Sequence, residues 1–131
     1  MHLHHHAIVV TDMDEAIRTF CDLLGQKLVI RHSGKGDITE VAFVEEPRTG
    51  HRLELLAKPN GKAGELDHIA YEVDDVDAEF KRLESAGLVP EDPPKDVPQG
   101  AFLFEKIHSS SCRLAHLRDK NNLKIQIVRY G

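Results

Sequence analysis

The chain has 131 residues, 40% of them hydrophobic, which is the size and composition of one ordinary globular domain. Its 22 acidic and 17 basic residues give a net charge of -5, so no uniform positive field exists to attract nucleic acid. The chain contains no apolar run of membrane-spanning length and no signal-peptide layout, which predicts a cytoplasmic protein without a membrane partner. Of its two cysteines, Cys21 is expected to be a buried thiol in an amphipathic helix, and Cys112 is expected to be an ordinary thiol.

Each half of the chain predicts a strand, a helix and three further strands. Asp12 and Asp75 are the expected N-caps of two amphipathic helices, which end at Gly25 and Gly87. The first helix should pack through apolar residues at helical spacing, down to Leu24. Short β-type runs follow the helices: Lys27–Arg31, Val41–Glu45, Arg52–Lys58, Val89, Arg113–Arg118 and Leu123–Arg129. The proline-rich segment Pro90–Pro98 predicts an irregular surface loop.

This shared order of elements reflects an internal repeat. Residues 5–14 match residues 68–77 at an offset of 63, with five of ten positions identical. Residues 41–44 match 114–117 at an offset of 73, and residues 53–56 match 125–128 at an offset of 72. We therefore expect an α+β fold in which one domain, residues 1–131, consists of two β-α-β-β-β modules, about 1–60 and 65–131. The modules should form a cupped mixed sheet with the helices on its outer face.

Strand alternation separates polar from apolar residues in each module. Ile8 and Val10 share an apolar face suited to the helix, and the opposite face receives His5. The same alternation puts Glu54, His68 and Gln126 on the face away from the helices. Two imidazoles, a carboxylate and an amide oxygen suit a divalent transition metal with positions open to substrate. The chain has nine histidines, and a purification tag or its remnant would explain His2 and His4.

The sequence resembles the vicinal oxygen chelate superfamily, also called the glyoxalase/bleomycin-resistance/dioxygenase superfamily, over nearly its whole length. The matching segments are residues 5–17, the helix end Leu23-Leu24-Gly25, Arg52-Leu53-Glu54-Leu55-Leu56, Asp67–Asp75 and Leu117–Val128. The resemblance implies paired modules around one divalent metal ion (Zn, Ni, Co, Mn or Fe) per site. It implies metal ligands at His5, Glu54, His68 and Gln126, and a carboxylate that removes a carbon-bound proton to form a stabilised enediolate or enolate.

One position departs from the pattern. Most metal-dependent glyoxalase I-like members carry Glu where this chain has Gln126 in Ile125-Gln126-Ile127. An amide can ligate through its oxygen but cannot act as a base near neutral pH. Glu54 is therefore the expected catalytic proton carrier, and Glu72 is a weaker candidate for a second base.

Other polar residues are weaker candidates. His116 is expected to be a half-buried structural histidine in a strand. Lys106, Arg113 and Arg118 are candidates for holding an anionic substrate, with solvated surface charge as the alternative. The segment Ile107–Ser111 lacks the glycines of a phosphate loop or nucleophile elbow, and we expect a loop there, a candidate rim over the cup.

The leading hypothesis for function is a metal-dependent lyase or isomerase of the glyoxalase I type, acting on a small carbonyl compound. The resemblance leaves three alternatives: a methylmalonyl-CoA epimerase-like enzyme, an Fe(II) extradiol-type dioxygenase, or a metal-free protein that binds a small molecule such as an antibiotic. It also implies a homodimer, in which the site lies within one chain or is shared between two. Substrate-binding residues are not assigned.

Overall fold

The structure is a computed structural model that describes residues 1–98 and 111–131. Internal contacts divide them into two compact units. The first half comprises His5–Asp67, and the second half comprises His68–Gly131 together with Met1–His4. Each half is described by itself below.

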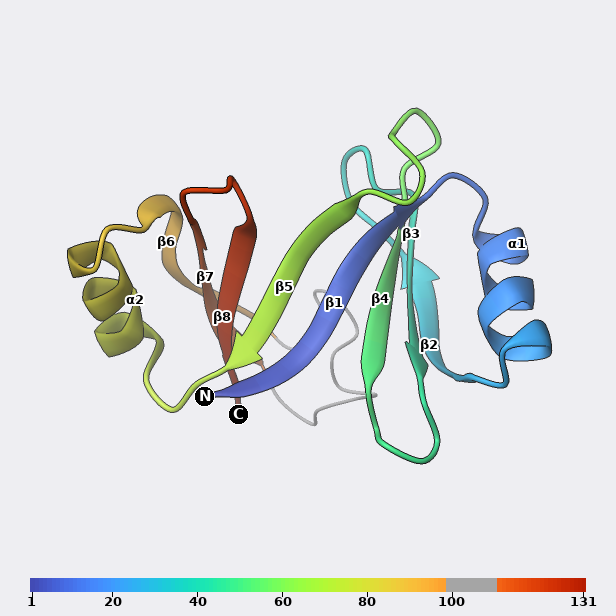
Figure 1. Ribbon diagram of the computed structural model, residues 1–131, viewed down its shortest axis with the longest axis horizontal. Helices are drawn as coiled ribbons and strands as arrows, with labels where there is room; N and C mark the ends of the chain where they lie inside the picture. The colour runs from blue at the N-terminus through green and yellow to red at the C-terminus, as the bar shows by residue number, and fades with distance from the viewer. Residues whose placement is uncertain (99–110) are drawn as a thin grey trace. The chain divides into compact units, whose positions relative to one another are not determined.

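The first half contains four strands in the order β2-β3-β4-β1. Strands β2 and β3 pair antiparallel, as do β3 and β4, whereas β4 and β1 pair parallel. The chain runs from β1 through two helical segments into β2, β3 and β4 (Figure 1). The bounds are β1 His2–Val10, α1 Met13–Ile17, η1 Arg18–Leu23, β2 Lys27–Ser33, β3 Glu40–Glu45 and β4 Arg52–Ala57.

The second half repeats this topology with strands in the order β5-β8-β7-β6. Its outer pairs are antiparallel and the β5–β8 pair is parallel. The predicted α+β fold class and the two β-α-β-β-β modules are thus confirmed. The bounds are β5 Leu66–Glu72, α2 Val76–Ser85, β6 Val89–Val97, β7 Cys112–Arg118 and β8 Lys124–Tyr130.

The two helices begin as the sequence predicts but continue differently. The side chain of Asp12 accepts from the backbone N–H of Glu15 at 3.1 Å, and Asp75 accepts from Ala78 at 3.0 Å. After Ile17 the first helix widens into the π-type segment η1, in which Leu24 N–H donates to the Thr19 carbonyl at 3.0 Å.

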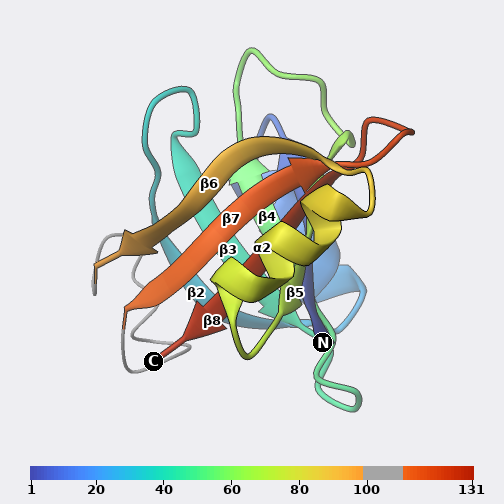
Figure 2. The same cartoon turned by 90° about the vertical axis from the view of Figure 1, so that its left-hand side faces the viewer.

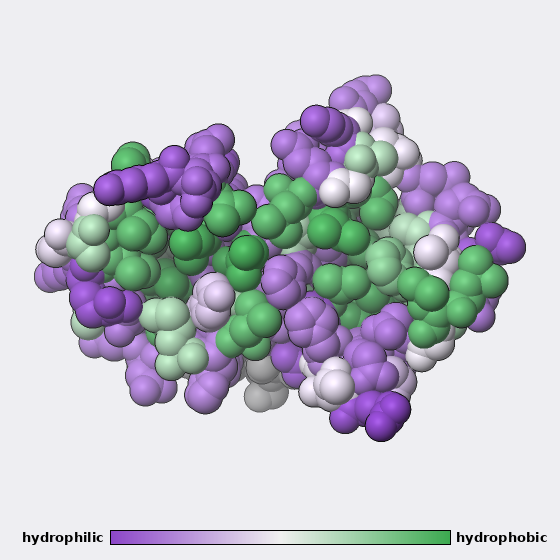
Figure 3. Space-filling view, viewed as in Figure 1, coloured by the Kyte–Doolittle hydropathy of each residue, from purple (hydrophilic) through white to green (hydrophobic). Residues whose placement is uncertain are grey.

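The π-type turn corrects one expectation about the first helix. Phe20 and Cys21 pack against the core, whereas Leu24 is 61% exposed. The wider turn changes the angular spacing of side chains, so the helical period that carried the prediction ends before Leu24. In Figure 3, hydrophobic residues lie exposed at the right-hand edge, where Figure 1 draws α1.

Each helix covers one face of its own sheet, as the strand alternation predicts. In the first half Met13 packs with Ala42, Val44, Leu55 and Ala57, and Ile8 and Val10 join this cluster. In the second half Val76 packs with Val73, Ala115, Leu117 and Ile127. Figure 2 looks onto that face, with α2 in front of the strands. The opposite surface of each sheet is called the helix-free face below.

The proline-rich segment 90–98 was predicted to be a loop, and this prediction was wrong. Residues Val89–Val97 form β6, which pairs only with β7 and is therefore the edge strand of its half. Register shifts follow Pro90 and Asp92. An edge strand needs only one side of its backbone to hydrogen-bond, so prolines are tolerated there, and the irregular register accommodates them.

Charged clamps tie each helix to its sheet. In the first half Arg31 of β2 contacts Asp14 of α1 at 2.8 Å and Glu40 of β3 at 3.0 Å. In the second half Arg113 of β7 contacts Asp77 of α2 at 2.7 Å and Asp96 of β6 at 3.0 Å. The two halves therefore place the arginine on different strands of the module.

Other expectations concern the termini and the thiols. His4 is buried in β1, and its ring lies 4.9 Å from that of Tyr130, so this residue belongs to the folded second half. Both cysteines are free thiols, as expected, but Cys21 is only partly buried and Cys112 is the buried one. None of the helical segments in the described part of the chain has the length and hydrophobicity that a membrane span requires.

Candidate metal centre

In the first half the structure brings His5 and Glu54 together. His5 lies in β1, two residues before Ala7, which pairs with Glu54 of the adjacent parallel strand β4. Both side chains lie on the helix-free face, and His5 Nε2 is 3.5 Å from Glu54 Oε1. His5 is 1% exposed and Glu54 is 8% exposed. Phe43 packs edge-on against the His5 ring at 5.1 Å between centroids, which restricts its rotation.

In the second half His68 and Gln126 occupy the equivalent positions. His68 precedes Ala70 of β5 by two residues, and Ala70 pairs with Gln126 of β8. Both side chains are buried. His116 lies next to both: its ring centroid is 6.1 Å from that of His68, and its Nε2 is 3.0 Å from Nε2 of Gln126. Each half thus has a buried histidine on its first strand and a buried oxygen-bearing side chain on its last strand, at equivalent positions.

His116 is buried, whereas the sequence predicts a half-buried structural histidine. Its Nδ1 lies 2.9 Å from Oδ2 of Asp92 in β6, although the angle departs from that of a good hydrogen bond. Burial, followed by the positive charge of Lys124 and the neighbouring His68, lowers the pKa of this imidazole to about 4 in spite of the opposing effect of Asp92. The ring is therefore neutral near pH 7.

These buried polar groups fit a metal ion. Buried histidine and carboxylate side chains are uncommon in proteins, and they gather most often at functional sites. Val9, Phe43 and Leu56 surround the first pair on its face. In each half a nitrogen donor and an oxygen donor are of the kinds that bind a divalent transition metal, and neither pair contains the thiolates typical of a structural zinc site.

The basic residues predicted to hold an anion are engaged elsewhere or lie outside the described residues. Arg113 forms the clamp with Asp77 and Asp96 on the helix side of the sheet. Arg118 donates to Glu91 at 2.6 Å and to the backbone carbonyl of Asn122 at 3.0 Å. The structure does not describe residues 99–110. Lys106 and the predicted loop Ile107–Ser111, except Ser111 itself, therefore lie outside the described residues.

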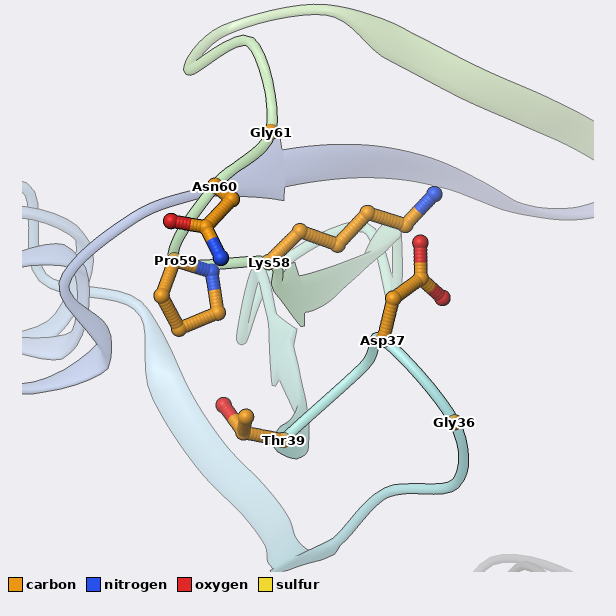
Figure 4. Close-up of a pocket in the computed structure, with 7 residues that line it drawn as sticks. All are labelled: Gly36, Asp37, Thr39, Lys58, Pro59, Asn60 and Gly61. Carbon is orange, nitrogen blue, oxygen red and sulfur yellow. The ribbon is translucent and has the colours of Figure 1, made fainter.

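Two pockets among the described residues are lined by side chains other than these buried pairs. One, of about 330 Å³, is formed by loop residues of the first half, and Figure 4 shows Lys58 and Asp37 along its wall. Lys58 already donates to Asp67 at 3.1 Å, so its charge is compensated. The other, of about 270 Å³, lies in the second half and is lined by Glu72 among others. Glu72, the candidate second base, thus faces a separate pocket.

Sequence reasoning missed Asp92, because the segment around it was predicted to be a loop. It also treated His116 as a structural residue. A signal for His116 existed in the repeat: the offset of 73 aligns His116 with Phe43, and the offset of 72 aligns Gln126 with Glu54. The strand register pairs Phe43 with Glu54 and His116 with Gln126. His116 therefore faces Gln126 at the position where, in the first half, Phe43 faces Glu54.

The fold and the buried residues define a class of protein that the comparisons identify. The family model of the Glyoxalase/Bleomycin resistance protein/Dioxygenase superfamily matches residues 2–127, so the chain belongs to this superfamily. The resemblance noted from the sequence is thereby confirmed. A comparison with curated proteins gave no match.

Solved structures share the fold over nearly the whole chain. Methylmalonyl-CoA epimerase from Mycobacterium tuberculosis has a TM-score of 0.76 and 22% identity, covering 99% of this chain and 88% of that one. A hypothetical protein from Bacillus halodurans has a TM-score of 0.75 and 16% identity, covering 98% and 94%. A Streptomyces coelicolor methylmalonyl-CoA epimerase variant in complex with 2-nitronate-propionyl-CoA has a TM-score of 0.72 and 17% identity, covering 100% and 98%.

Proposed function

We propose that this protein is a metal-dependent enzyme that isomerises a small carbonyl compound by moving a carbon-bound proton, as a glyoxalase I-type lyase does. The observation that carries the proposal is the buried carboxylate of Glu54, 3.5 Å from His5 on the helix-free face. Among residues 1–98 and 111–131, no other carboxylate is buried. One buried carboxylate suits a reaction that needs one base.

The proposed ligands of a single divalent ion (Zn, Ni, Co, Mn or Fe) are His5, Glu54, His68 and Gln126. Their burial and donor types support this assignment, as does their equivalent placement in the two halves. When bound, the ion would supply positive charge beside the substrate oxygen that becomes negative during enolisation. His5 and His68 would bind as neutral imidazoles, and Gln126 through its amide oxygen.

Glu54 would carry the proton. For an α-oxo thiohemiacetal, its carboxylate takes the proton from the carbon that bears sulfur and hydroxyl, and the resulting acid returns it to the adjacent carbonyl carbon. One C–H bond breaks and one forms, the hydroxyl proton passes to the former carbonyl oxygen, the carbonyl thereby moves to the neighbouring carbon, and the product is an α-hydroxy thioester. No oxidant or reductant is consumed. Gln126 contributes no proton, since an amide has no accessible protonation change.

An epimerase of the methylmalonyl-CoA type is the second candidate, and the solved epimerase structures that share the fold favour it. The first proton abstraction would be the same. Inversion, however, requires a second acid on the opposite side of the substrate carbon. Glu72 lines a separate pocket in the second half, so the buried residues favour the one-base reaction.

The experiment is a direct comparison of substrates on chelator-treated protein reloaded with each candidate metal. We expect conversion of methylglyoxal in the presence of a cellular thiol. The Glu54→Gln variant should lose about 10²- to 10⁴-fold in rate, while Glu72→Gln serves as the matched control and should retain it. Turnover of methylmalonyl-CoA alone would establish the epimerase instead.

Other outcomes would reject both candidates. Oxygen uptake on a catechol with ferrous iron would indicate a dioxygenase. A folded protein that binds no divalent ion but retains a small molecule would indicate a binding protein. The homodimer expected from the family stays a prediction, which light scattering checks against the chain mass of 14.7 kDa.

A further inference from the structure

Three side chains form one cross-strand row on the helix-free face of the second half. The antiparallel register pairs Asp92 of β6 with His116 of β7, and His116 with Gln126 of β8. His116 Nδ1 lies 2.9 Å from the Asp92 carboxylate, and His116 Nε2 lies 3.0 Å from the Gln126 amide nitrogen. Both ring nitrogens therefore have a close polar neighbour, one on each side of the ring.

The identities of these neighbours determine where the ring proton lies. Nδ1 faces a carboxylate oxygen, and two lone pairs at that distance would repel, so Nδ1 carries the proton. Nε2 faces an amide nitrogen, which is only a donor, so Nε2 must present its lone pair. The Gln126 amide then donates an N–H to His116. Since an amide carries nitrogen and oxygen on opposite branches, Oε1 points away from His116.

We propose that Asp92 and His116 are positioning residues that hold the Gln126 amide with its oxygen, rather than its nitrogen, available to the metal ion. This inference rests on the proposed function, in which Gln126 is a ligand. An NH₂ group has no lone pair for a metal, so an amide in the opposite orientation would be no ligand at all. Outer contacts of this kind orient metal ligands in proteins.

The first half provides an internal comparison. Its equivalent row consists of Ile30, Phe43 and Glu54, paired in the same register across β2, β3 and β4. Both flanking residues are apolar there. A carboxylate has an oxygen on either branch and needs no partner to choose between them. The amide thus has two polar neighbours in its row, Asp92 and His116. The carboxylate has two apolar neighbours, Ile30 and Phe43.

The test is a double-mutant cycle on metal affinity, measured with Co²⁺ alone by calorimetry and by the visible spectrum of the bound ion. His116→Phe copies the first-half row and should weaken Co²⁺ binding about 10- to 100-fold when residue 126 is Gln. In the Gln126→Glu background, His116→Phe should weaken Co²⁺ binding by less than about threefold, because a carboxylate presents an oxygen to the metal in either orientation. Equal losses in both backgrounds would reduce His116 to a structural residue and overturn the inference.

Two further measurements keep the inference testable. Asp92→Asn, on the more exposed edge strand, removes the charge that fixes the ring proton and should weaken Co²⁺ binding only in the Gln126 background. His32→Phe, on the helix-free face of the first half, is the matched control and should leave affinity unchanged. NMR of the metal-free protein measures the tautomer of His116 directly. We expect the proton on Nδ1, and a proton on Nε2 would overturn the inference. If the tautomer is as inferred and Co²⁺ does not bind the wild-type protein, the proposed function fails, and the ligand role of Gln126 fails with it.

Discussion

The buried His116 should make the stability of the metal-free protein depend on pH. The native imidazole has a pKa of about 4, against 6.5 in the unfolded chain, chiefly because burial disfavours its charged form. Between these two values the unfolded state binds a proton that the native state does not, so acidification favours unfolding. The contribution is constant above pH 6.5 and is lost progressively down to about pH 4. At 1.36 kcal/mol per pH unit, the full loss is about 3 kcal/mol.

Urea unfolding of chelator-treated protein isolates this effect. Wild-type protein and His116→Phe are compared between about pH 4.5 and 7.5, so that carboxylates common to both proteins cancel in the difference. On lowering the pH across this range, wild type should lose about 2 to 3 kcal/mol more of its free energy of unfolding than the variant. Parallel pH profiles for the two proteins would refute the argument, because they would mean that His116 titrates alike in the folded and unfolded chains.

Two further predictions concern local structure. Asp75→Ala removes the side chain that caps α2 at Ala78 and should lower the free energy of unfolding by about 1 kcal/mol, with Asp75→Asn nearly neutral; equal losses in both variants would contradict the capping role. Burial raises the pKa of the Cys112 thiol to about 11. In a Cys21→Ser variant, a disulfide reagent at about pH 8 should therefore react with Cys112 slowly until denaturant is added. Rapid reaction in the native protein would show that the thiol is accessible.

The module architecture and the helix starts could be predicted because local rules decide them. Strand alternation placed His5 and Ile8 on opposite faces, and the capping aspartates set where the helices begin. The edge strand β6 could not be predicted in the same way. Its prolines are typical of loops, and only pairing with β7, a contact distant in sequence, makes them compatible with a strand.

The strand positions of the four proposed ligands could be predicted, whereas the residues around them could not. The repeat selects Glu54 and Gln126 as equivalent residues, since both follow from the offset between the halves. The contact from His116 to Asp92 depends on an irregular register between β6 and β7, which no local pattern encodes. Positions where the halves differ in chemistry, such as Phe43 and His116, are the places where the repeat itself indicates a specialised role.

The charged clamps limit how the halves could be recombined. Glu40 and Arg113 are equivalent positions with opposite charge, and each faces a partner of the other sign within its own half. A chimera that carried β3 in place of β7 would set Glu40 against Asp77 and Asp96, three carboxylates with no cation among them. An engineered graft would therefore keep these ion pairs only if a strand and its charged partners were transferred together.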